Sequence, residues 1–348
     1  MSSPALVGGI SLRAYDLPAA SVFAAAYGLL VPLLVLRIAQ GRSRTSVLFN
    51  TISFAIERVI VFSLRASVAA RPNTESLGFS EYMQATFALG FFTLAHIVGV
   101  LIRAVLINST TGSESSMDVA VPPLVSSPGS LWKSSAPPQS FTTEDDPKRR
   151  FWFRRWHEYI LLLYVSGMVL AIVATAHIYA ANDSTPNHRD QALRYASSAI
   201  GLVLVLSQMV MLLWARHNGP RINQRAVQFL LVACTLLTIP PIYRLIVMRS
   251  TTSNLATPDH QALNTRADKA TFYVFHLLPE WIVVAMLCSF NLREICQIGF
   301  KGDSKWRDET PEEKAKREKK KQERAMKKAE RLELKSARSV SGSVTTLA

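Results

Sequence analysis

Apolar residues along the chain gather in long runs that are separated by short polar segments. A helix needs roughly 20 mostly apolar residues to cross the hydrocarbon core of a bilayer, and about seven runs reach this length. They are residues 19–39, 47–68, 83–107, 159–181, 196–215, 226–247 and 270–290. Several contain Gly and Ser, which allow membrane helices to pack closely. The pattern predicts an all-α fold, a polytopic bundle of about seven transmembrane helices.

Basic residues are distributed unevenly over the connections. The first, third and fifth connections and the C-terminal tail are rich in Lys and Arg. The alternate connections hold fewer, among them Arg65, Arg71, Arg189 and Arg194. Because positive charge marks the cytoplasmic side, we expect residues 1–18 to form an extracellular N-terminus and the C-terminus to lie inside. The chain is expected to be a multi-pass protein of the plasma membrane.

The third connection is residues 108–158, and its part from Asn108 to Pro147 is rich in Ser, Thr, Pro and Gly with few apolar residues. Such a segment buries too little apolar surface to offset its ordering entropy, so a disordered cytoplasmic loop is predicted. The loop ends in a basic and aromatic cluster that includes Arg149, Arg150, Arg154 and Arg155. Directly before a transmembrane helix, this composition is typical of an interfacial anchor that binds anionic lipid. Nucleic acid is the less favoured partner.

Residues 293–348 form a predicted basic cytoplasmic tail. A dense Lys, Glu and Arg series follows Glu312 with almost no apolar residue, which predicts a solvated helix and no coiled coil. Lys319, Lys320 and Lys321 are expected to attract anionic lipid of the inner leaflet. A solubilising tail is the alternative.

A glycosylation signal is present at Asn182, which is followed by Asp183 and Ser184. This triplet matches the acceptor pattern for N-glycosylation. The topology places it in an outer connection, where the sugar can be added, although such triplets also occur by chance.

Three charged residues lie where charge is costly. Glu57 and Arg58 are near the middle of the second run, and Glu280 is inside the last. An ionisable side chain at this depth costs several kcal/mol and normally faces a protein interior or a water-filled cavity. At a rise of 1.5 Å per residue the three reach similar depths. Since neighbouring side chains on a helix point about 100° apart, we expect Arg58 to pair with Glu280.

Four further polar residues lie nearer the outer ends of the last two predicted helices. They are Tyr243, Arg244, Tyr273 and His276. We expect them to hold an anionic group that enters from outside. The alternative is structural: the ion pair locks the packing and Arg244 extends toward the interface.

Prolines interrupt the same two helices at Pro240, Pro241 and Pro279. Proline removes a backbone hydrogen bond and kinks or breaks a helix. Freed carbonyls are tolerated at bilayer depth only against protein or water. These positions therefore favour a polar cavity and a hinge beside Glu280.

Several catalytic chemistries lack their residues. Lys269 is too near the edge of the last helix for a retinal attachment site, and His96, His177 and His276 fall on separate helices. A phosphate-binding Gly-x-x-x-x-Gly-Lys-Ser/Thr motif is missing from the sequence. We therefore expect no enzyme, no cofactor and no metal site.

The last two helices resemble a known family. The segments Pro241-Ile-Tyr-Arg244 and Thr271-Phe-Tyr-Val-Phe275 are similar to the late-helix pattern of the fungal aminocholesterol-resistance family. Its members are seven-helix proteins described as lipid-translocating exporters. The resemblance carries over to Tyr243, Arg244, Tyr273 and Phe275. The architecture also resembles G-protein-coupled receptors, although neither an Asp-Arg-Tyr nor an Asn-Pro-x-x-Tyr motif is present.

Three functions follow from these observations. A receptor-like protein would sense a ligand through a polar cavity near the second, sixth and seventh helices and signal to a cytosolic partner. A lipid or small-molecule transporter would use the midplane charges as part of its path. A non-catalytic membrane scaffold would use only its loop and tail.

Overall fold

The computed structural model describes residues 3–41, 43–71, 76–111, 145–176, 188–219, 221–252 and 263–299, together with separate residues between 307 and 330. The chain divides into two compact units, Met1–Ser304 and Lys305–Ala348. The first unit is a helical bundle. The second contains the basic tail.

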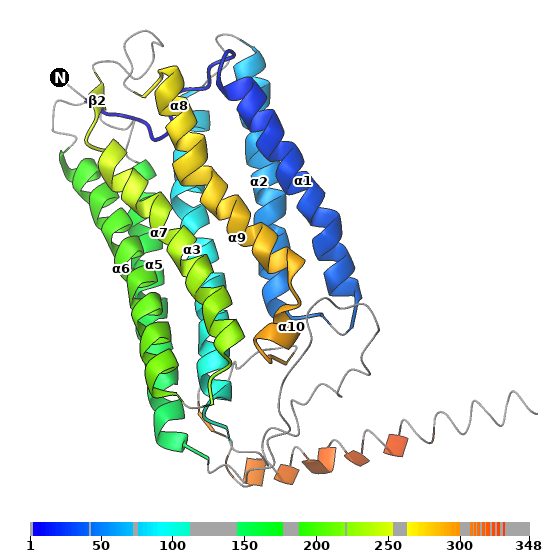
Figure 1. The fold of residues 1–348 in the computed structure, drawn as a ribbon. Helices are drawn as coiled ribbons and strands as arrows, with labels where there is room; N and C mark the ends of the chain where they lie inside the picture. The colour runs from blue at the N-terminus through cyan, green and yellow to red at the C-terminus, as the bar shows by residue number, and fades with distance from the viewer. Residues whose placement is uncertain are drawn as a thin grey trace, which may run out of the picture. The chain divides into compact units, whose positions relative to one another are not determined.

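The first six long helices of the bundle are each continuous (Figure 1). They are α1 (Asp16–Ala39), α2 (Ser46–Ala70), α3 (Leu77–Asn108), α5 (Pro147–Ala176), α6 (His188–Asn218) and α7 (Gln224–Val247). The seventh is composite and consists of α8 (Arg266–Phe272), a π-helical segment η2 (Tyr273–Leu277) and α9 (Leu278–Ser289). A short helix, α10 (Leu292–Ile295), follows. Two short strands, β1 (Ser3–Pro4) and β2 (Thr251–Thr252), pair in antiparallel fashion.

Within the described residues, seven helices are long and apolar enough to cross a membrane. This confirms the predicted number of spans and the helical fold class. The residues that pack between them form one large apolar core.

Several helices begin well before the apolar run that predicted them. α3 begins at Leu77, α5 at Pro147 and α6 at His188, whereas the runs begin at 83, 159 and 196. A helix can continue beyond the hydrocarbon layer, because its backbone stays hydrogen-bonded while its polar side chains meet water. The predicted end of the loop at residue 158 is therefore wrong, because α5 already begins at Pro147. The basic and aromatic cluster is the first part of α5, and proline suits the first position of a helix. Residues 112–144 lie outside the described part.

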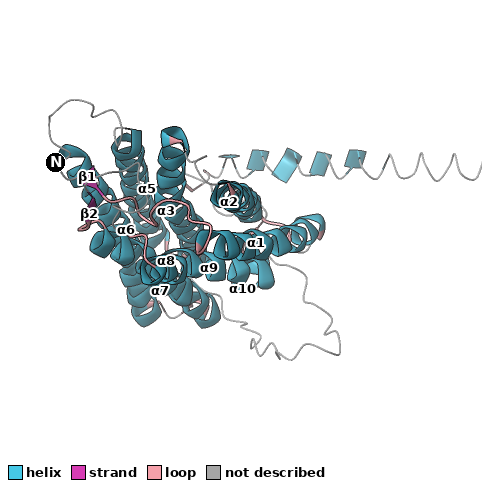
Figure 2. Cartoon of the chain, turned by 90° about the horizontal axis from the view of Figure 1, so that it is seen from above, coloured by secondary structure: helices cyan, strands magenta, loops and turns pink. Residues whose placement is uncertain are grey.

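The bundle is built around α3. In its most apolar window 78% of α3 is buried, against 22% for α1. Helices α2, α5, α6, α7 and α9 all contact α3, and α1 packs on α2 and α9 (Figure 2). Polar groups on α3 and on the helices around it can therefore meet without contacting lipid.

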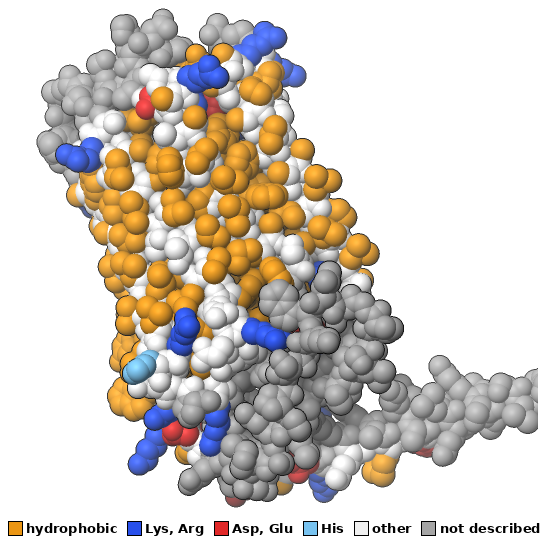
Figure 3. Space-filling model, viewed as in Figure 1, with side chains coloured by type: hydrophobic (Ala, Val, Ile, Leu, Met, Phe, Trp, Pro, Cys, Tyr) orange, Lys and Arg blue, Asp and Glu red, His pale blue; other side chains and the backbone are white. Residues whose placement is uncertain are grey.

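The outside of the bundle is apolar. Large side chains such as Leu29, Leu162, Val210 and Ile246 are more than 60% exposed. Figure 3 shows hydrophobic side chains over the middle of the helices, with Lys and Arg nearer the two ends. A surface of this kind is stable in lipid and unfavourable in water. The seven apolar helices and this surface together indicate a multi-pass membrane protein.

Residues before α1 enter the bundle. Ala5, Leu6 and Val7 are at most 2% exposed, at the end of the bundle where α1 begins. We call this end the N-terminal end. Residues 1–18 were expected to form an extracellular N-terminus that precedes the first helix. The structure corrects this division, since α1 already begins at Asp16.

In the second unit, the described residues from 312 to 330 are helical and exposed, among them Lys319 and Lys320. Thr310 begins this helix: its hydroxyl accepts a hydrogen bond from the Glu313 backbone, and the Glu313 carboxylate accepts one from the Thr310 backbone. This reciprocal pair is a capping box. The hydrogen bond from Thr310 lowers the pKa of Glu313 below its usual value.

Candidate functional site in the bundle core

Four buried polar side chains follow one face of the seventh span. Lys269, Tyr273, His276 and Glu280 are spaced by four, three and four residues, and none is more than 6% exposed. We call these four residues the polar column. Side chains three or four positions apart lie on the same face of a helix, so the column points continuously toward the bundle interior.

The π-helical turn lies in the middle of the column. The backbone N–H of Leu278 donates to the carbonyl of Tyr273, five residues earlier. Pro279 has no N–H to continue the α-helical pattern, and a wider turn accommodates this loss. The kink predicted at Pro279 therefore takes the form of a π turn. By contrast, α7 continues through Pro240 and Pro241.

The predicted ion pair at the midplane is present. Arg58 Nη2 donates to Glu280 Oε2 at 2.8 Å, and both side chains are fully buried. Arg58 also donates to the Thr86 carbonyl at 3.3 Å and lies over the Phe54 ring. Space for the guanidinium depends on Gly90, where a Cβ atom would lie 1.5 Å from Arg58 Nη2.

Glu57 contacts the same arginine through the other terminal nitrogen of its guanidinium. Its Oε2 lies 3.7 Å from Arg58 Nη1, and its side chain is 36% exposed while Arg58 has no exposure. Arg58 therefore lies between one buried carboxylate and one that faces outward. Glu57 was expected in a polar centre inside the bundle with Arg58 and Glu280, whereas its side chain is partly exposed.

Arg244, Tyr243 and His276 also come together, as predicted. Tyr243 stacks on His276 with ring centroids 6.0 Å apart, and His276 Nε2 lies 3.2 Å from the Phe87 carbonyl. Arg244 Nε donates to Ser198 Oγ at 3.4 Å. Within the described residues, Arg244 Nη1, His276 Nδ1 and Glu280 Oε1 are buried and have no hydrogen-bond partner.

Tyr273 belongs instead to an ion cluster at the N-terminal end. Its hydroxyl donates to Asp16 Oδ1 at 2.9 Å. Arg65 donates to the same oxygen at 2.8 and 3.0 Å, and Lys269 Nζ lies 2.8 Å from Asp16 Oδ2. The sequence pattern did not predict Asp16, Arg65 and Lys269 as site residues, because each lies at or near the edge of an apolar run. The sequence feature that could have indicated these three residues is that each is charged and lies at the edge of an apolar run.

A groove opens on the side of the bundle next to Glu57. It has a volume of about 450 Å³ and lies between α2, α3 and α5. It is polar for a surface at membrane depth. Its polar lining residues are Asn50, Ser53, Glu57, Thr86, Thr93, His96 and Tyr164. We call it the lateral groove.

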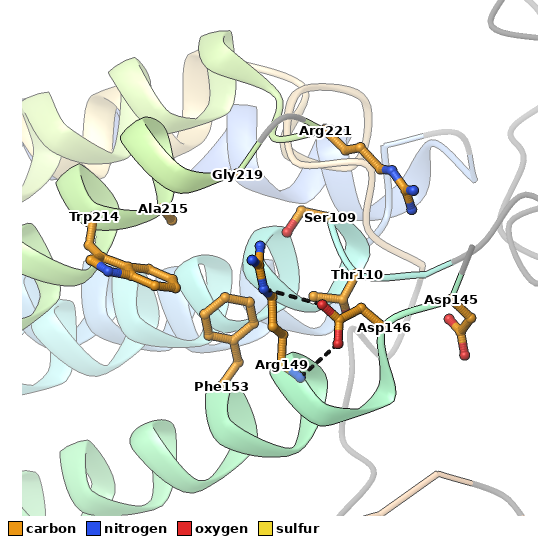
Figure 4. Close-up of a pocket in the computed structure, with 10 residues that line it drawn as sticks. All are labelled: Ser109, Thr110, Asp145, Asp146, Arg149, Phe153, Trp214, Ala215, Gly219 and Arg221. Atoms are coloured by element: carbon orange, nitrogen blue, oxygen red, sulfur yellow. Dashed lines mark hydrogen bonds and ion pairs between the residues drawn. The ribbon is translucent and has the colours of Figure 1, made fainter. Parts of the chain in front are cut away.

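A second pocket, of about 390 Å³, lies at the opposite end of the bundle from the N-terminal segment. Figure 4 shows Arg149 bound to Asp146, with the aromatic side chains of Phe153 and Trp214 nearby. The ion pair measures 3.2 Å, and both side chains are about half exposed. Charges of both signs line this pocket, so it does not select an anion or a cation by charge alone.

The four arginines of the predicted lipid anchor point in different directions. Arg150 and Arg154 are 7% and 5% exposed, and Arg150 donates to the Thr110 carbonyl at 3.1 Å. Arg149 is half exposed, and Arg155 is partly exposed and pairs with Glu158 at 2.7 Å. The prediction that all four bind lipid is therefore corrected for Arg150 and Arg154, which face protein. Helical geometry is the reason, because the cluster is part of α5.

Two predicted positions, Asn182 and Lys321, lie outside the described residues. Among the residues that the structure describes, no group of three or more His, Cys, Asp and Glu could hold a metal ion. Comparison of the chain with family models, with curated proteins and with solved structures finds no match.

Proposed function

We propose that this chain is a receptor-like protein of the plasma membrane that binds a small amphiphile in its lateral groove. Glu57 carries this proposal, because it lines the groove and also contacts the buried Arg58. A bound head group at Glu57 would therefore act on the Arg58–Glu280 pair without entering the closed core.

The chemistry of the groove favours a ligand with an amino or hydroxyl head group. A carboxylate facing hydrocarbon is costly unless it gains a hydrogen-bond or charge partner. Asn50, Ser53 and Thr93 add hydrogen-bonding groups to the lining, and Tyr164 stacks on His96 at its side. An alkyl chain would extend along the apolar surface of the neighbouring helices.

Glu280 provides the route by which binding is transmitted. It lies three residues after the π-helical segment that interrupts the seventh span. π-helical turns are less regular than the α-helix around them and recur at functional sites. A change in the charge around Arg58 would shift the equilibrium between two arrangements of this turn. The inner end of α9 would move with the turn.

The proposed topology places the N-terminus outside and the tail inside. On that side, Arg149, Arg155 and the tail residues Lys319, Lys320 and Lys321 would attract anionic lipid and border a cytosolic signalling partner. Asn182 would be glycosylated on the outer side. The uneven distribution of Lys and Arg supports this orientation.

Filling the groove tests the proposal. Ser53→Trp would place a large ring in the lining, whereas Ser63→Trp adds the same ring to another exposed position of α2 that does not line the groove. We expect a photoreactive long-chain alkylamine to label the Ser63→Trp protein as it labels wild type, and the Ser53→Trp protein at least tenfold less. Equal labelling of both variants would contradict a ligand site in the groove.

A transporter is the second candidate, and the buried polar atoms without partners favour it. Arg244 Nη1, His276 Nδ1 and Glu280 Oε1 could each bind a water or a passing polar group. The resemblance of the last two helices to lipid-translocating exporters points in the same direction. Flux of a fluorescent lipid in reconstituted vesicles, lost in Glu280→Gln but not in Glu158→Gln, would support transport.

A further inference from the structure

The segment Ala5–Ile10 is buried at the N-terminal end of the bundle. Ala5, Leu6 and Val7 are almost completely buried, and Ile10 is 9% exposed. Val7 joins the main apolar core, while Leu6 and Ile10 form a small separate cluster with Leu12. Short terminal segments are poorly ordered unless they are tied down, so the contacts of this one need explanation.

Side chains of the bundle form hydrogen bonds with the backbone of this segment. Gln84 on α3 makes two such bonds with Val7: its Oε1 accepts from the Val7 N–H at 3.1 Å and its Nε2 donates to the Val7 carbonyl at 2.9 Å. This arrangement reproduces the pairing of a neighbouring strand. Hydrogen bonds to the main chain are a common source of affinity when a protein binds a peptide.

Basic residues bind the carbonyl groups of the segment. Arg65 on α2 donates to the Gly8 carbonyl at 2.8 Å, and Lys269 donates to the same oxygen at 2.6 Å. Arg194 on α6 donates to the Ala5 carbonyl at 3.1 Å. Three cations therefore surround the segment, and the Asp16 carboxylate pairs with two of them. The carbonyls of Gly8 and Ala5 also accept hydrogen bonds from these cations.

The site also selects the sequence of its occupant. Gly8 and Gly9 have φ angles of +81° and +58°, which favour glycine. A Cβ on Gly8 would lie 2.8 Å from the Phe272 ring, and one on Gly9 would lie 2.2 Å from Asn264 Oδ1. A segment with side chains at these two positions would not fit.

The linker to the first helix is open to solvent. Arg13, Ala14 and Tyr15 are all exposed and form a turn before Asp16. The segment is thus tightly held on one side and joined to the bundle through an accessible connection on the other. A proteolytic cut there would turn it into a separate peptide ligand.

We propose that the N-terminal end of the bundle is a binding site for a short peptide that makes a tight turn, and that residues 5–10, in which the Gly9 N–H donates to the Leu6 carbonyl at 2.9 Å, are its tethered occupant. The ligand class is a short segment with two adjacent glycines whose backbone carbonyls face Arg65, Lys269 and Arg194. The segment acts as a removable plug over the polar column. This inference does not depend on the lateral groove or on its ligand.

The test separates the peptide from the bundle. A recognition site for a sequence-specific protease is inserted between Arg13 and Ala14 of the full chain, and the purified protein is cut. A fluorescent synthetic peptide of residues 2–13 is then added, and its binding is followed by anisotropy. We expect saturable binding that unlabelled peptide reverses, and at least tenfold weaker binding of a Gly8→Val peptide.

A matched pair of bundle variants locates the site. Gln84→Leu removes both bonds to Val7, whereas Gln228→Leu changes an exposed glutamine on α7. The first should weaken peptide binding at least tenfold and the second should leave it unchanged. Three results would overturn the proposal: loss of the folded state on cleavage, a fragment that never exchanges with added peptide, or equal binding by the two variants.

Discussion

At the scale of single residues, the core depends on how charge is placed around Arg58. The guanidinium has one buried partner, Glu280, and one partly exposed partner, Glu57. Removing one member of a buried pair leaves the other charge uncompensated, at a cost of about 3–5 kcal/mol. The pair was predictable because both residues interrupt apolar runs at the same depth. The exposure of Glu57 could not be predicted from the sequence, because it depends on which helices lie beside α2.

Gly90 offers a direct test of this packing. In Gly90→Ala the new methyl group would overlap Arg58 Nη2 and push the guanidinium away from Glu280. Overpacking of this kind costs typically 1–3 kcal/mol, so the melting temperature in detergent should fall by several degrees. Gly28→Ala is the control, because no atom lies within 4 Å of its added Cβ. A fall of the same size in both variants would show that Gly90 has no special role.

At the scale of elements, the helices end in specific polar contacts that hydropathy does not reveal. Asn108 at the end of α3 donates to the Gln297 carbonyl at 2.7 Å, and Asn223 before α7 donates to the Ile295 carbonyl at 2.8 Å. These two side-chain amides hold the α10 region against the end of α3 and the beginning of α7. Apolar runs predicted the spans themselves, because burial in lipid requires them. They could not predict helix ends, where polar side chains make tertiary contacts.

The packing of α10 has a chemical consequence for Cys296. Its side chain is 2% exposed, and burial raises the pKa of the thiol to about 12. Since only the thiolate reacts, the neutral thiol should resist iodoacetamide at pH 8 in the folded protein and react after denaturation. A cysteine placed at the exposed Met326 should react at once. Rapid modification of Cys296 in the folded protein, followed by mass spectrometry, would contradict this packing.

At the scale of the whole molecule, seven spans and the charge distribution define a membrane protein with one predicted orientation. The sequence pattern predicted the number of helices but not which helices contact one another. The buried cluster of Asp16, Arg65 and Lys269 joins the first, second and seventh spans, and no local pattern connects these positions. The insertion of residues 5–10 among the helices is likewise a tertiary feature, formed by side chains far away in the sequence.

Cysteine labelling in intact cells tests the orientation. Single reporters are placed at Ser2 and at Ala348, and a membrane-impermeant maleimide is applied from outside. The Ser2 reporter should react, because fewer basic residues lie on that side of the bundle than on the other, and the Ala348 reporter should react only after permeabilisation. Reaction of both reporters from outside would require an even number of spans.

The central claim is that a head group in the lateral groove acts through Glu57 on the buried ion pair. A ligand that binds only the folded state raises its stability, by about 2.7 kcal/mol at roughly a hundredfold excess over Kd. The decisive measurement is the shift in melting temperature caused by dodecylamine in wild type, Glu57→Gln and the control Glu158→Gln. We predict a clear increase in wild type and in the control, and almost none in Glu57→Gln. An equal increase in all three proteins would contradict the account.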